Sequence, residues 1–592
     1  PNMKHLLLSI YCFLALDSLF CQKHDYVWLS GAYNLADDSA TNFILDFKTF
    51  PPVVDKIDSK IFITLDNGSI SDKDGDLTFY TNMCKIKNRE HETLYNGEGL
   101  SLGPFHDFYC GANGSYPLLQ GVFALPGKDK TYDLFHLRGL IDPPGPNLVC
   151  WIGALLHSRI DMNAQQGKGE VVFKDSVLLE ACLQTACANR HANGRDWWIL
   201  AADNTENRFY RFLSTPDGIE GPWIQDIENP TTQDTFFYLG WSEFSPDGEY
   251  FLVYDVHSGA AVYSFDRCTG LLSSLWHLPG DPDSYGWSAA FSPDSRFVYI
   301  VKDQFASIRQ FDLHAADITA SQTTVAVWDS FFYYLPGSSG GNGGRQTFFG
   351  FFQHGPDGKL YNWAGDTKYM HVMNFPNRKG TQCDVIQRAV ELPYHTFGAN
   401  AYYPNYRLGP VDGSVCDSLG IDNLPVALFR YDLEDSLAPL AFTFTDLSYY
   451  APTNWHWDFG DGSSSQDTSP VHVFPAAGTY NVCLTVSNAF AADTFCRQIQ
   501  VGTVGLSELL PVLPLARVSP NPCGDLLRVS LPAMTGENPV FVLFDMFGRP
   551  ILTRTLTHFE TPLDTKRLPA GMYGWQLRYR GVVAQSGKVV KQ

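Results

Sequence analysis

The stretch that decides the fold is FSPDGEYFLVY, residues 244–254, in which a tight turn runs directly into an apolar segment. Proline presets the first turn angle, Asp247 bonds its own backbone, and Gly248 takes the positive φ that such a turn needs. Residues 250–254 are aromatic or aliphatic and favour a strand. This short stretch therefore predicts a hairpin edge followed by a buried strand.

The same unit recurs at residues 291–300 and 354–363, after 47 and then 63 residues. A second strand follows the first after a short polar break, at residues 262–265 and 308–311. Fainter copies lie at residues 74–80 and 197–200. Repeats of this length with several strands each are typical of propeller blades. We expect an all-β protein in which residues 23–424 form a β-propeller of about six to eight blades.

Composition supports this class and excludes others. The 592 residues include 63 acids and 42 bases, a net charge of −21, which argues against nucleic acid as a partner because phosphate binding needs cations. Hydrophobic residues make up 44%, enough for several cores, and aromatic residues 14%. The repeat resembles the WD40-like propellers with Pro-Asp-Gly turns that are common in surface proteins of the Bacteroidota.

The N-terminus has the pattern of an export signal. Met3 is the expected start, preceded by Pro1 and Asn2, and Lys4 supplies the positive charge. The apolar run at 6–16 is too short to span a bilayer, and no other stretch is long enough. We expect residues 1–22 to be a signal peptide, cleaved after Cys21 and leaving a mature chain without a membrane helix.

The cysteines agree with export. Of 13 cysteines, 11 remain after cleavage, so at least one thiol is unpaired within the chain. No spacing of a structural zinc site occurs, and we expect neither a metal nor another cofactor. The nearest neighbours in sequence are the expected bridges: Cys84 with Cys110, Cys182 with Cys187, Cys383 with Cys416, and Cys483 with Cys496.

Residues 425–502 carry a sharper pattern. The run WHWDFGDG at 455–462 places a hairpin signal between two strands, and residues 480–487 alternate apolar with polar as in a half-buried strand. The segment resembles a PKD domain, which implies an immunoglobulin-like β-sandwich used as a spacer. The residues that carry the resemblance are Trp457, Asp458, Phe459, Gly460, Asp461, Gly462 and Tyr480.

Residues 513–592 form another small β unit after a linker at 503–512. It resembles the C-terminal sorting domain of the type IX secretion system, which implies passage through the type IX translocon and its sorting machinery to the cell surface or the medium. Gly574–Trp575 departs from the apolar run expected after the tyrosine. The residues that carry the resemblance are Pro520, Asn521, Pro522, Gly548, Gly571, Tyr573 and Lys588.

Motifs that suggest chemistry are weak. Residues 337–341 match G-x-S-x-G, but their Pro and Gly flanks predict a loop and not a nucleophile elbow. Residues 72–76 resemble the start of a calcium loop but lack its later ligands. We expect His191, Arg195 and Asp196 to form a structural blade turn with two buried tryptophans, and His354 to make a structural hydrogen bond.

No catalytic residue is predicted. The favoured hypothesis is a non-catalytic exported protein whose propeller binds an unknown extracellular protein or glycan. The alternative is a secreted hydrolase or lyase that acts on external polysaccharide or protein through the propeller funnel. A clustered acid–base pair in the funnel would favour the enzyme, and a funnel lined by apolar and backbone groups would favour the binding protein.

Overall fold

The computed structural model describes residues 22–592 except 35–38, 64–66, 113, 119, 142–149, 229–240, 256–257, 281–287, 335–343, 397–400, 435–439, 503–515, 521, 532–538, 546–549, 557, 559 and 580–581. The predicted linker and all but the last residue of the predicted signal peptide lie outside these residues. In the part that is described, strands dominate, and no helix has the length and apolarity to cross a membrane.

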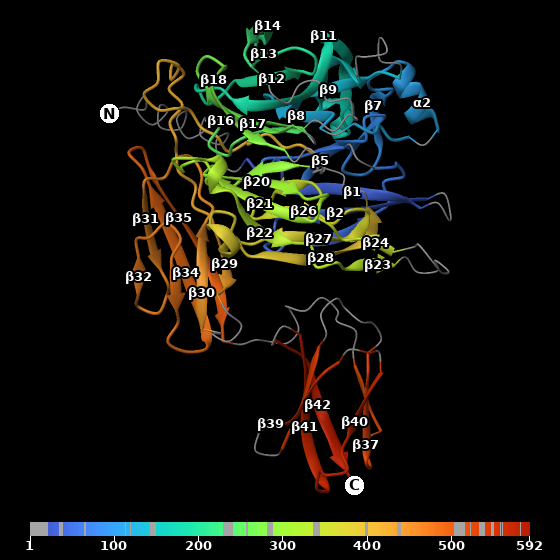
Figure 1. Ribbon diagram of the computed structural model, residues 1–592. Coiled ribbons are helices and arrows are strands. Elements are labelled where there is room, and N and C mark those ends of the chain that lie inside the picture. The colour runs from blue at the N-terminus through green and yellow to red at the C-terminus, as the bar shows by residue number, and fades with distance from the viewer. Residues whose placement is uncertain are drawn as a thin grey trace.

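Antiparallel sheets repeat through residues 27–396 and form the blades of a β-propeller (Figure 1). The predicted all-β propeller is therefore confirmed. Seven blades can be followed in the described residues. In chain order they are β1–β3 (Val27–Asn34, Ser39–Asp46, Val53–Ile57); β4–β7 (Gly68–Ser71, Leu77–Thr81, Lys85–Asn88, Thr93–Glu98); β8–β11 (Val122–Pro126, Thr131–Gly139, Ile152–Asp161, Glu170–Arg190); the end of β11 with β12–β14 (Trp197–Asp203, Arg208–Thr215, Gly218–Asp226); β15–β18 (Trp241–Phe244, Tyr250–Asp255, Gly259–Asp266, Leu271–Pro279); β19–β22 (Ala289–Phe291, Phe297–Lys302, Ser307–Asp312, Thr323–Val327); and β25–β28 (Phe352–His354, Leu360–Trp363, Thr367–Met373, Val385–Thr396).

Short elements decorate the blades. They are the hairpin β23–β24 (Phe332–Tyr334, Gly344–Gln346), the helices α2 (Pro104–Ala112) and α3 (Ala164–Gly167), and the 3-10 turns η1 (Thr319–Ser321) and η2 (Gly380–Cys383).

The Pro-Asp-Gly turn forms as its residues predict. Gly248 has φ +75° and its amide donates to the carbonyl of Ser245 at 2.8 Å. Ser245 Oγ also accepts the amide of Tyr250 at 2.9 Å and so ties the turn to β16. Ser292 repeats this role toward Phe297 at 2.8 Å. The serine before the proline, for which no role is predicted from the sequence, thus anchors the first two of these hairpins, whereas the third has Gly355 at this position.

Strand β11 belongs to two blades. Its first part pairs with β10 and is largely exposed, as the outer strand of a blade is. Residues 183–190 are buried throughout and pair with β12 as an inner strand. One strand of 21 residues thus closes the third blade and opens the fourth.

Apolar faces of neighbouring blades pack against each other. Leu252 and Val262 of the fifth blade share a core cluster with Phe291, Val298 and Ile300 of the sixth. Radial packing of small sheets therefore buries the strand faces that the repeat predicts.

Two of the four predicted disulfides are present, Cys84–Cys110 and Cys483–Cys496. The predicted Cys182–Cys187 pair is wrong, because both residues lie on β11, and five residues of strand span about 16 Å. Cys182 instead bonds Cys150. The predicted Cys383–Cys416 pair is also wrong: Cys416 bonds Cys268 in the turn after β17, across 148 residues. Cys187, Cys383 and Cys523 are buried and unpaired among the described residues.

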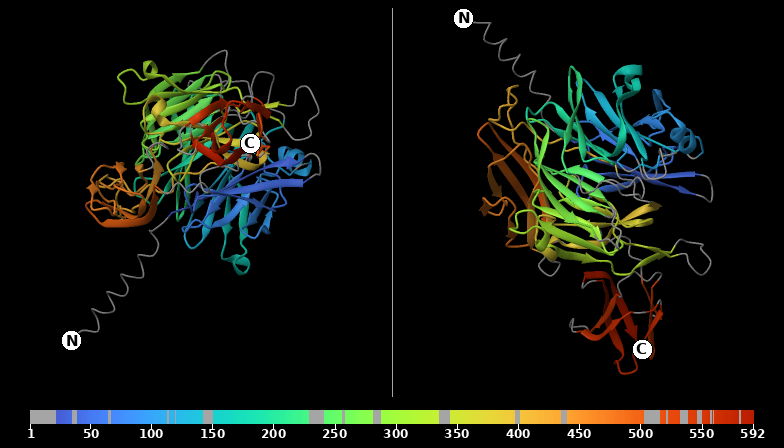
Figure 2. Two further views of the ribbon diagram at one scale, coloured as in Figure 1. Left: turned by 90° about the horizontal axis from the view of Figure 1, so that it is seen from below. Right: turned by 45° about the horizontal axis from the view of Figure 1, so that its top comes forward.

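Two β-sandwiches follow the propeller (Figure 2). The first packs a three-stranded sheet on a four-stranded one around Trp457 and Phe429, and the second does the same around Leu527 and Trp575. Their strands are β29–β35 (Phe429–Leu433, Ala441–Asp446, Asn454–Asp458, Ser464–Ser465, Val471–Val473, Gly478–Ser487, Ala492–Val501) and β36–β42 (Arg517–Ser519, Leu526–Ser530, Val540–Phe544, Pro550–Thr555, Glu560–Asp564, Gly571–Tyr579, Val582–Lys591).

Candidate functional site

The axis of the propeller is the first place to look for a site, because the inner strands of all blades converge there. After the last blade the chain turns into the sequence AYYPNY, residues 401–406, which we call the axial segment. It forms no strand, yet Ala401, Tyr402 and Tyr406 are buried. Its contacts decide whether the axis is open to a ligand.

Three tyrosine hydroxyls of the axial segment donate to backbone carbonyls of inner strands. Tyr402 Oη donates to Ala188 in β11 at 3.1 Å, Tyr403 Oη to Val27 in β1 at 3.2 Å, and Tyr406 Oη to Ala124 in β8 at 2.8 Å. Burial raises the pKa of all three hydroxyls above the usual range, so they remain neutral donors.

Further contacts reach other blades. Gln353 Nε2 in β25 donates to the carbonyl of Ala401 at 3.3 Å, and Asn405 Nδ2 donates to the carbonyl of Pro246 at 2.6 Å. Ser69 of β4 hydrogen-bonds the hydroxyl of Tyr403. The axial segment therefore contacts every blade except the sixth through hydrogen bonds.

A buried polar network joins the third, fourth and fifth blades beside the axial segment. Gln120 Nε2 donates to the carbonyl of Ser242 at 2.8 Å, and Gln120 Oε1 accepts the Ser242 amide at 2.9 Å. Thr185 Oγ1 also donates to Gln120 Oε1 at 3.1 Å. These polar atoms bond each other, which suits a role in holding the blades together.

One acid–base pair does lie on the inner strands. Glu243 of β15 is 6% exposed, and its Oε1 lies 3.7 Å from His354 Nε2 of β25. The same oxygen accepts the amide of Phe291 in β19 at 2.6 Å. His354 Nε2 is buried and makes no hydrogen bond in the described residues, so the structural bond predicted for His354 is not found. The Glu243 carboxylate thus links the fifth and sixth blades, and His354 is close enough for an electrostatic interaction with it.

The axial segment leaves the propeller between two buried arginines. Arg190 Nη1 donates to the Arg195 carbonyl at 2.9 Å and its guanidinium lies over the Trp197 ring at 3.7 Å. Arg267 donates to the carbonyls of Arg190 and Gly409. Burial lowers the pKa of both arginines to about 10, which leaves them charged at neutral pH. Both arginines donate to backbone carbonyls and so fix the chain where it follows the axial segment.

The cluster around His191 is structural, as predicted. Arg195 Nε and Asn193 Nδ2 both donate to the Asp196 carboxylate at 2.7 Å, and Trp197 and Trp198 are buried. His191 Nε2 hydrogen-bonds the carbonyl of Cys268 at 3.1 Å.

The calcium-loop-like stretch at residues 72–76 is a turn held by its own backbone. Asp72 Oδ1 accepts the amides of Asp74 and Asp76, an Asx turn, and Asp76 pairs with Lys48. In the described part of the chain no cluster of side chains could hold a metal ion. The G-x-S-x-G at 337–341 lies outside the described residues.

In the first sandwich the motif residues build the core and one hairpin. Trp457 and Phe459 are buried, and the Phe459 ring stacks on His472 with centroids 3.9 Å apart. Asp461 Oδ2 lies 2.8 Å from His472 Nε2. Asp458 accepts the Gly460 amide at 2.9 Å, Gly462 has φ +93°, and Tyr480 Oη donates to the Ala476 carbonyl at 2.9 Å. His456, between Trp455 and Trp457, is exposed.

The first sandwich is held against the propeller by charged contacts. Arg430, 3% exposed, donates to the carbonyl of Asp357 at 2.9 Å. Lys359 Nζ lies 2.9 Å from Asp432 Oδ1. Burial raises the pKa of Asp357, whose Oδ2 accepts the Tyr361 hydroxyl at 2.9 Å.

The sorting-motif residues lie in the second sandwich. Gly571 begins β41, Tyr573 is 8% exposed and donates to the Pro569 carbonyl at 2.7 Å, and Lys588 in β42 pairs with Gly574. Pro520 and Pro522 flank residue 521, which with Gly548 lies outside the described residues. Trp575, the noted departure, is buried in the core.

Comparison with known proteins identifies one segment. The family model for the PKD domain matches residues 426–502. The PKD1 domain of a Vibrio cholerae metalloprotease is 30% identical over 13% of this chain and 96% of that domain, with a TM-score of 0.12. A Lactobacillus plantarum protein is 13% identical over 62% of this chain and 97% of its own, with a TM-score of 0.37.

A periplasmic gluconolactonase of Pseudomonas aeruginosa is 12% identical over 62% of this chain and 96% of its own, with a TM-score of 0.34. No curated protein matches the chain. Through residues 426–502 the chain belongs to the PKD domain family.

Proposed function

We propose that this chain is an exported protein of the bacterial surface whose propeller binds an extracellular protein or glycan. The PKD domain spaces the propeller from the second sandwich, and the second sandwich is the sorting domain read by the type IX machinery. The motif residues at 520–588 and the export pattern at 3–21 support the route. The net charge of −21 speaks against nucleic acid as the ligand.

The observation that carries the binding role is the axial segment. An active site at a propeller axis needs free volume and polar groups that are not already bonded. Here three tyrosines reach the inner strands, and their hydroxyls already donate to backbone carbonyls. Binding therefore falls to the outside of the blades, where large aromatic rings are exposed, among them Tyr95 at 67% and Phe108 at 63%.

The test uses the mature chain, residues 22–592, on an array of glycans and extracellular-matrix proteins, read for both retention and released product. We expect retention without product. The double variant Y95A/F108A removes two exposed rings, and the double variant V327A/V415A, also exposed, is the matched control. Equal retention by both variants would place the binding surface elsewhere on the blades, and no retention of the wild type at all would refute the proposal.

A second candidate, hydrolysis at the axis, is favoured only by the Glu243–His354 pair. If it is correct, product appears on the array and Glu243→Gln abolishes it while retention persists. If Glu243→Gln leaves product unchanged, the axis has no part in the reaction.

A further inference from the structure

A second G-x-S-x-G sequence occurs at Gly99–Leu100–Ser101–Leu102–Gly103, which the sequence analysis did not single out. It follows strand β7 directly and leads into helix α2. Strand, turn and helix in that order are the context in which this motif presents a nucleophilic serine. The context is met here, by this turn of the second blade.

The turn has a strained backbone at the serine. Ser101 has φ +57° and Gly99 has φ +69°. A serine in this region costs energy that the surrounding structure must supply, and such residues concentrate at functional sites. The strained residue is the one that carries the hydroxyl.

Ser101 is hydrogen-bonded to a histidine from the neighbouring blade. Ser101 Oγ lies 2.7 Å from Nδ1 of His136 in β9, and His136 Nε2 lies 2.9 Å from Oγ of Ser158 in β10. All three side chains are 0% exposed. The Asp175 carboxylate lies 3.7 Å from Nε2, which favours the proton on that nitrogen and leaves Nδ1 to accept the serine proton.

Asp175 also occupies the anion position of the turn. Its Oδ1 accepts the amide of Ser101 at 2.9 Å and its Oδ2 accepts the amide of Leu102 at 3.0 Å. In a nucleophile elbow the amide after the serine stabilises the oxyanion of the tetrahedral intermediate. The internal carboxylate therefore sits where that oxyanion would form.

A purely structural role would explain why these side chains are buried. It would not explain why a serine with a positive φ also faces a histidine nitrogen. Tying a turn to a blade needs neither a strained serine nor a histidine nitrogen facing its hydroxyl. Burial lowers the pKa of His136 to about 4, so the ring is neutral at pH 7 and one ring nitrogen keeps a lone pair. Leu102, the next residue along the chain, is 51% exposed, so the turn lies at the surface although the Ser101 side chain is buried.

We propose that Ser101 is a latent nucleophile for small carboxylic esters, with His136 as its base, Ser158 holding the histidine, and Asp175 masking the oxyanion position. This goes beyond the binding role, because the site is off the axis and uses none of its residues.

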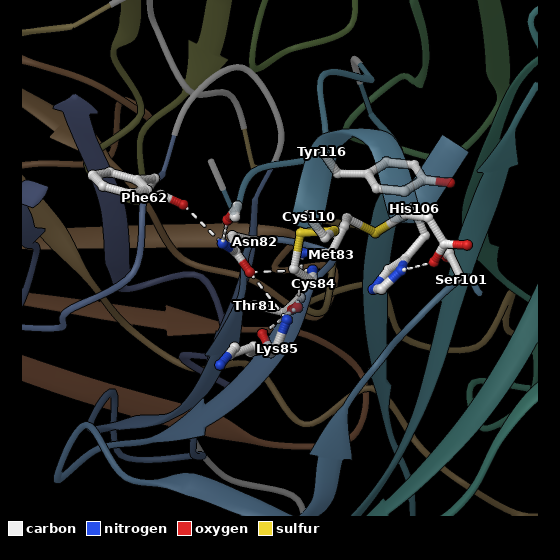
Figure 3. Close-up of a disulfide and its surroundings, with 12 residues drawn as sticks. Phe62, Thr81, Asn82, Met83, Cys84, Lys85, Ser101, His106, Cys110 and Tyr116 are labelled. Atoms are coloured by element: carbon white, nitrogen blue, oxygen red, sulfur yellow. Dashed lines mark hydrogen bonds and ion pairs between the residues drawn. A yellow bond between two sulfur atoms is a disulfide. The ribbon is translucent and has the colours of Figure 1, made fainter. Parts of the chain in front are cut away.

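The Cys84–Cys110 bridge joins the start of β6 to the end of α2, with Ser101 among the surrounding residues (Figure 3). The Gly99 amide donates to the Cys84 carbonyl at 3.1 Å. The Gly99 end of the motif is thereby fixed to a residue of the bridge, and the helix that follows the motif carries the other cysteine.

The reaction balances with water as the only other reactant. Ser101 Oγ attacks the ester carbonyl and passes its proton to Nδ1 of His136. The bond to the alcohol breaks, the alkoxide takes that proton, and acyl-Ser101 remains. Water repeats the sequence in reverse roles, so that the carboxylic acid leaves and the serine is restored.

The test is labelling of the mature chain, residues 22–592, with an alkyl fluorophosphonate at pH 7.5, located by peptide mass spectrometry. Attack of Ser101 forms an Oγ–P bond and expels fluoride. We expect slow labelling at Ser101 in the wild type and a rise of about tenfold or more in Asp175→Ala, because the oxyanion donors become free. Asp175→Asn loses the charge but keeps one acceptor oxygen at the turn, so its labelling should rise less than that of Asp175→Ala.

Controls separate the site from general reactivity. Ser101→Ala must lose the label, and Ser339→Ala, the same change in the other G-x-S-x-G sequence, must keep it. Ser158→Ala must lower the rate, since the histidine loses its support. Circular dichroism and melting curves show which variants are folded. Absence of label at Ser101 in a folded Asp175 variant, or equal labelling of Ser101 in urea, overturns the proposal.

Discussion

The Arg430 guanidinium donates to the backbone carbonyl of Asp357 at 2.9 Å, from the PKD domain into a turn of the last propeller blade. The arginine is 3% exposed and the aspartate 1% exposed. A spacer on a flexible tether would not bury an arginine against its neighbour. The two domains therefore meet through a formed interface.

Arg430→Ala leaves buried carbonyls without a donor and should weaken the interface by about 1–3 kcal/mol. Calorimetry should then show the PKD domain melting apart from the propeller, where the wild type melts with it. Arg528→Ala, which removes an arginine half-exposed in the second sandwich, is the control. Identical melting of both variants would contradict a coupled interface.

The axial tyrosines give a second prediction. Tyr402→Phe and Tyr406→Phe each remove a hydroxyl that satisfies a buried carbonyl, and each should lower the free energy of unfolding by about 1–3 kcal/mol. Urea unfolding measures the effect. Tyr95→Phe, at a side chain 67% exposed, should leave the midpoint unchanged. Axial variants as stable as the control would mean that these hydroxyls do not support the fold.

The disulfides differ in the length of chain that they close. In the chain-entropy account, removing Cys268–Cys416, whose cysteines are separated by 148 positions in the sequence, costs roughly 5 kcal/mol. Removing Cys483–Cys496, with a separation of 13, costs roughly 3 kcal/mol. Paired Cys→Ser variants of each bridge, compared by urea unfolding, test the order. The reverse order would show that native contacts, and not loop length, set the cost.

Buried histidines predict loss of stability in acid. His24 and His371 have their pKa lowered by burial to about 4, against 6.5 in the unfolded chain. Between these values the unfolded state binds more protons, so stability is full above pH 6.5 and falls as the pH drops toward 4, by about 3 kcal/mol per histidine.

Urea unfolding at pH 7.5, 6 and 5 measures this loss. His24→Asn retains a donor for the Ser71 carbonyl and should flatten the slope by one proton. The raised pKa of Asp357 acts in the opposite direction, since its carboxyl gains a proton more readily when folded. Constant stability over this range would be at odds with neutral buried histidines.

Export gives the last prediction. Deleting residues 513–592 should trap the protein in the periplasm of its host, because the deletion removes the sorting signal that we propose for the second sandwich. Cell fractionation and surface proteolysis with and without the deletion measure the outcome. Deletion of the PKD domain alone, residues 426–502, is the control and should leave export intact. Unchanged surface display of the shortened chain would refute the sorting role.

The features that could be predicted from the sequence are those that depend on residues adjacent in the chain. The Pro-Asp-Gly turns, the strands after them and the hairpin at Asp461–Gly462 depend on a few adjacent residues, and they form as expected. The shared strand β11 could not be predicted, since nothing local marks residue 183 as the point where one blade ends. Cys150 and Cys416 find partners that only the ring of blades brings near.

The same limit applies to the sites. No sequence pattern marks residues 401–406, and their role depends on hydrogen bonds to six blades. The G-x-S-x-G at 99–103 was readable, but its histidine lies 35 residues away on another blade and only the fold pairs them.

The bridge between Cys268 and Cys416 bears on how the molecule responds to mechanical load. If the protein is held at the cell surface through its C-terminal end, as we propose, load is applied along the chain from residue 592 toward the propeller. Tension that reaches Cys416 passes through the sulfur atoms into the turn after β17, and the fifth blade takes it up. The tyrosines at 402–406 lie within the loop that this disulfide closes, so the disulfide and not the axial segment carries the load. Force on a bound ligand therefore acts on the blades and does not pull the axial segment from its place.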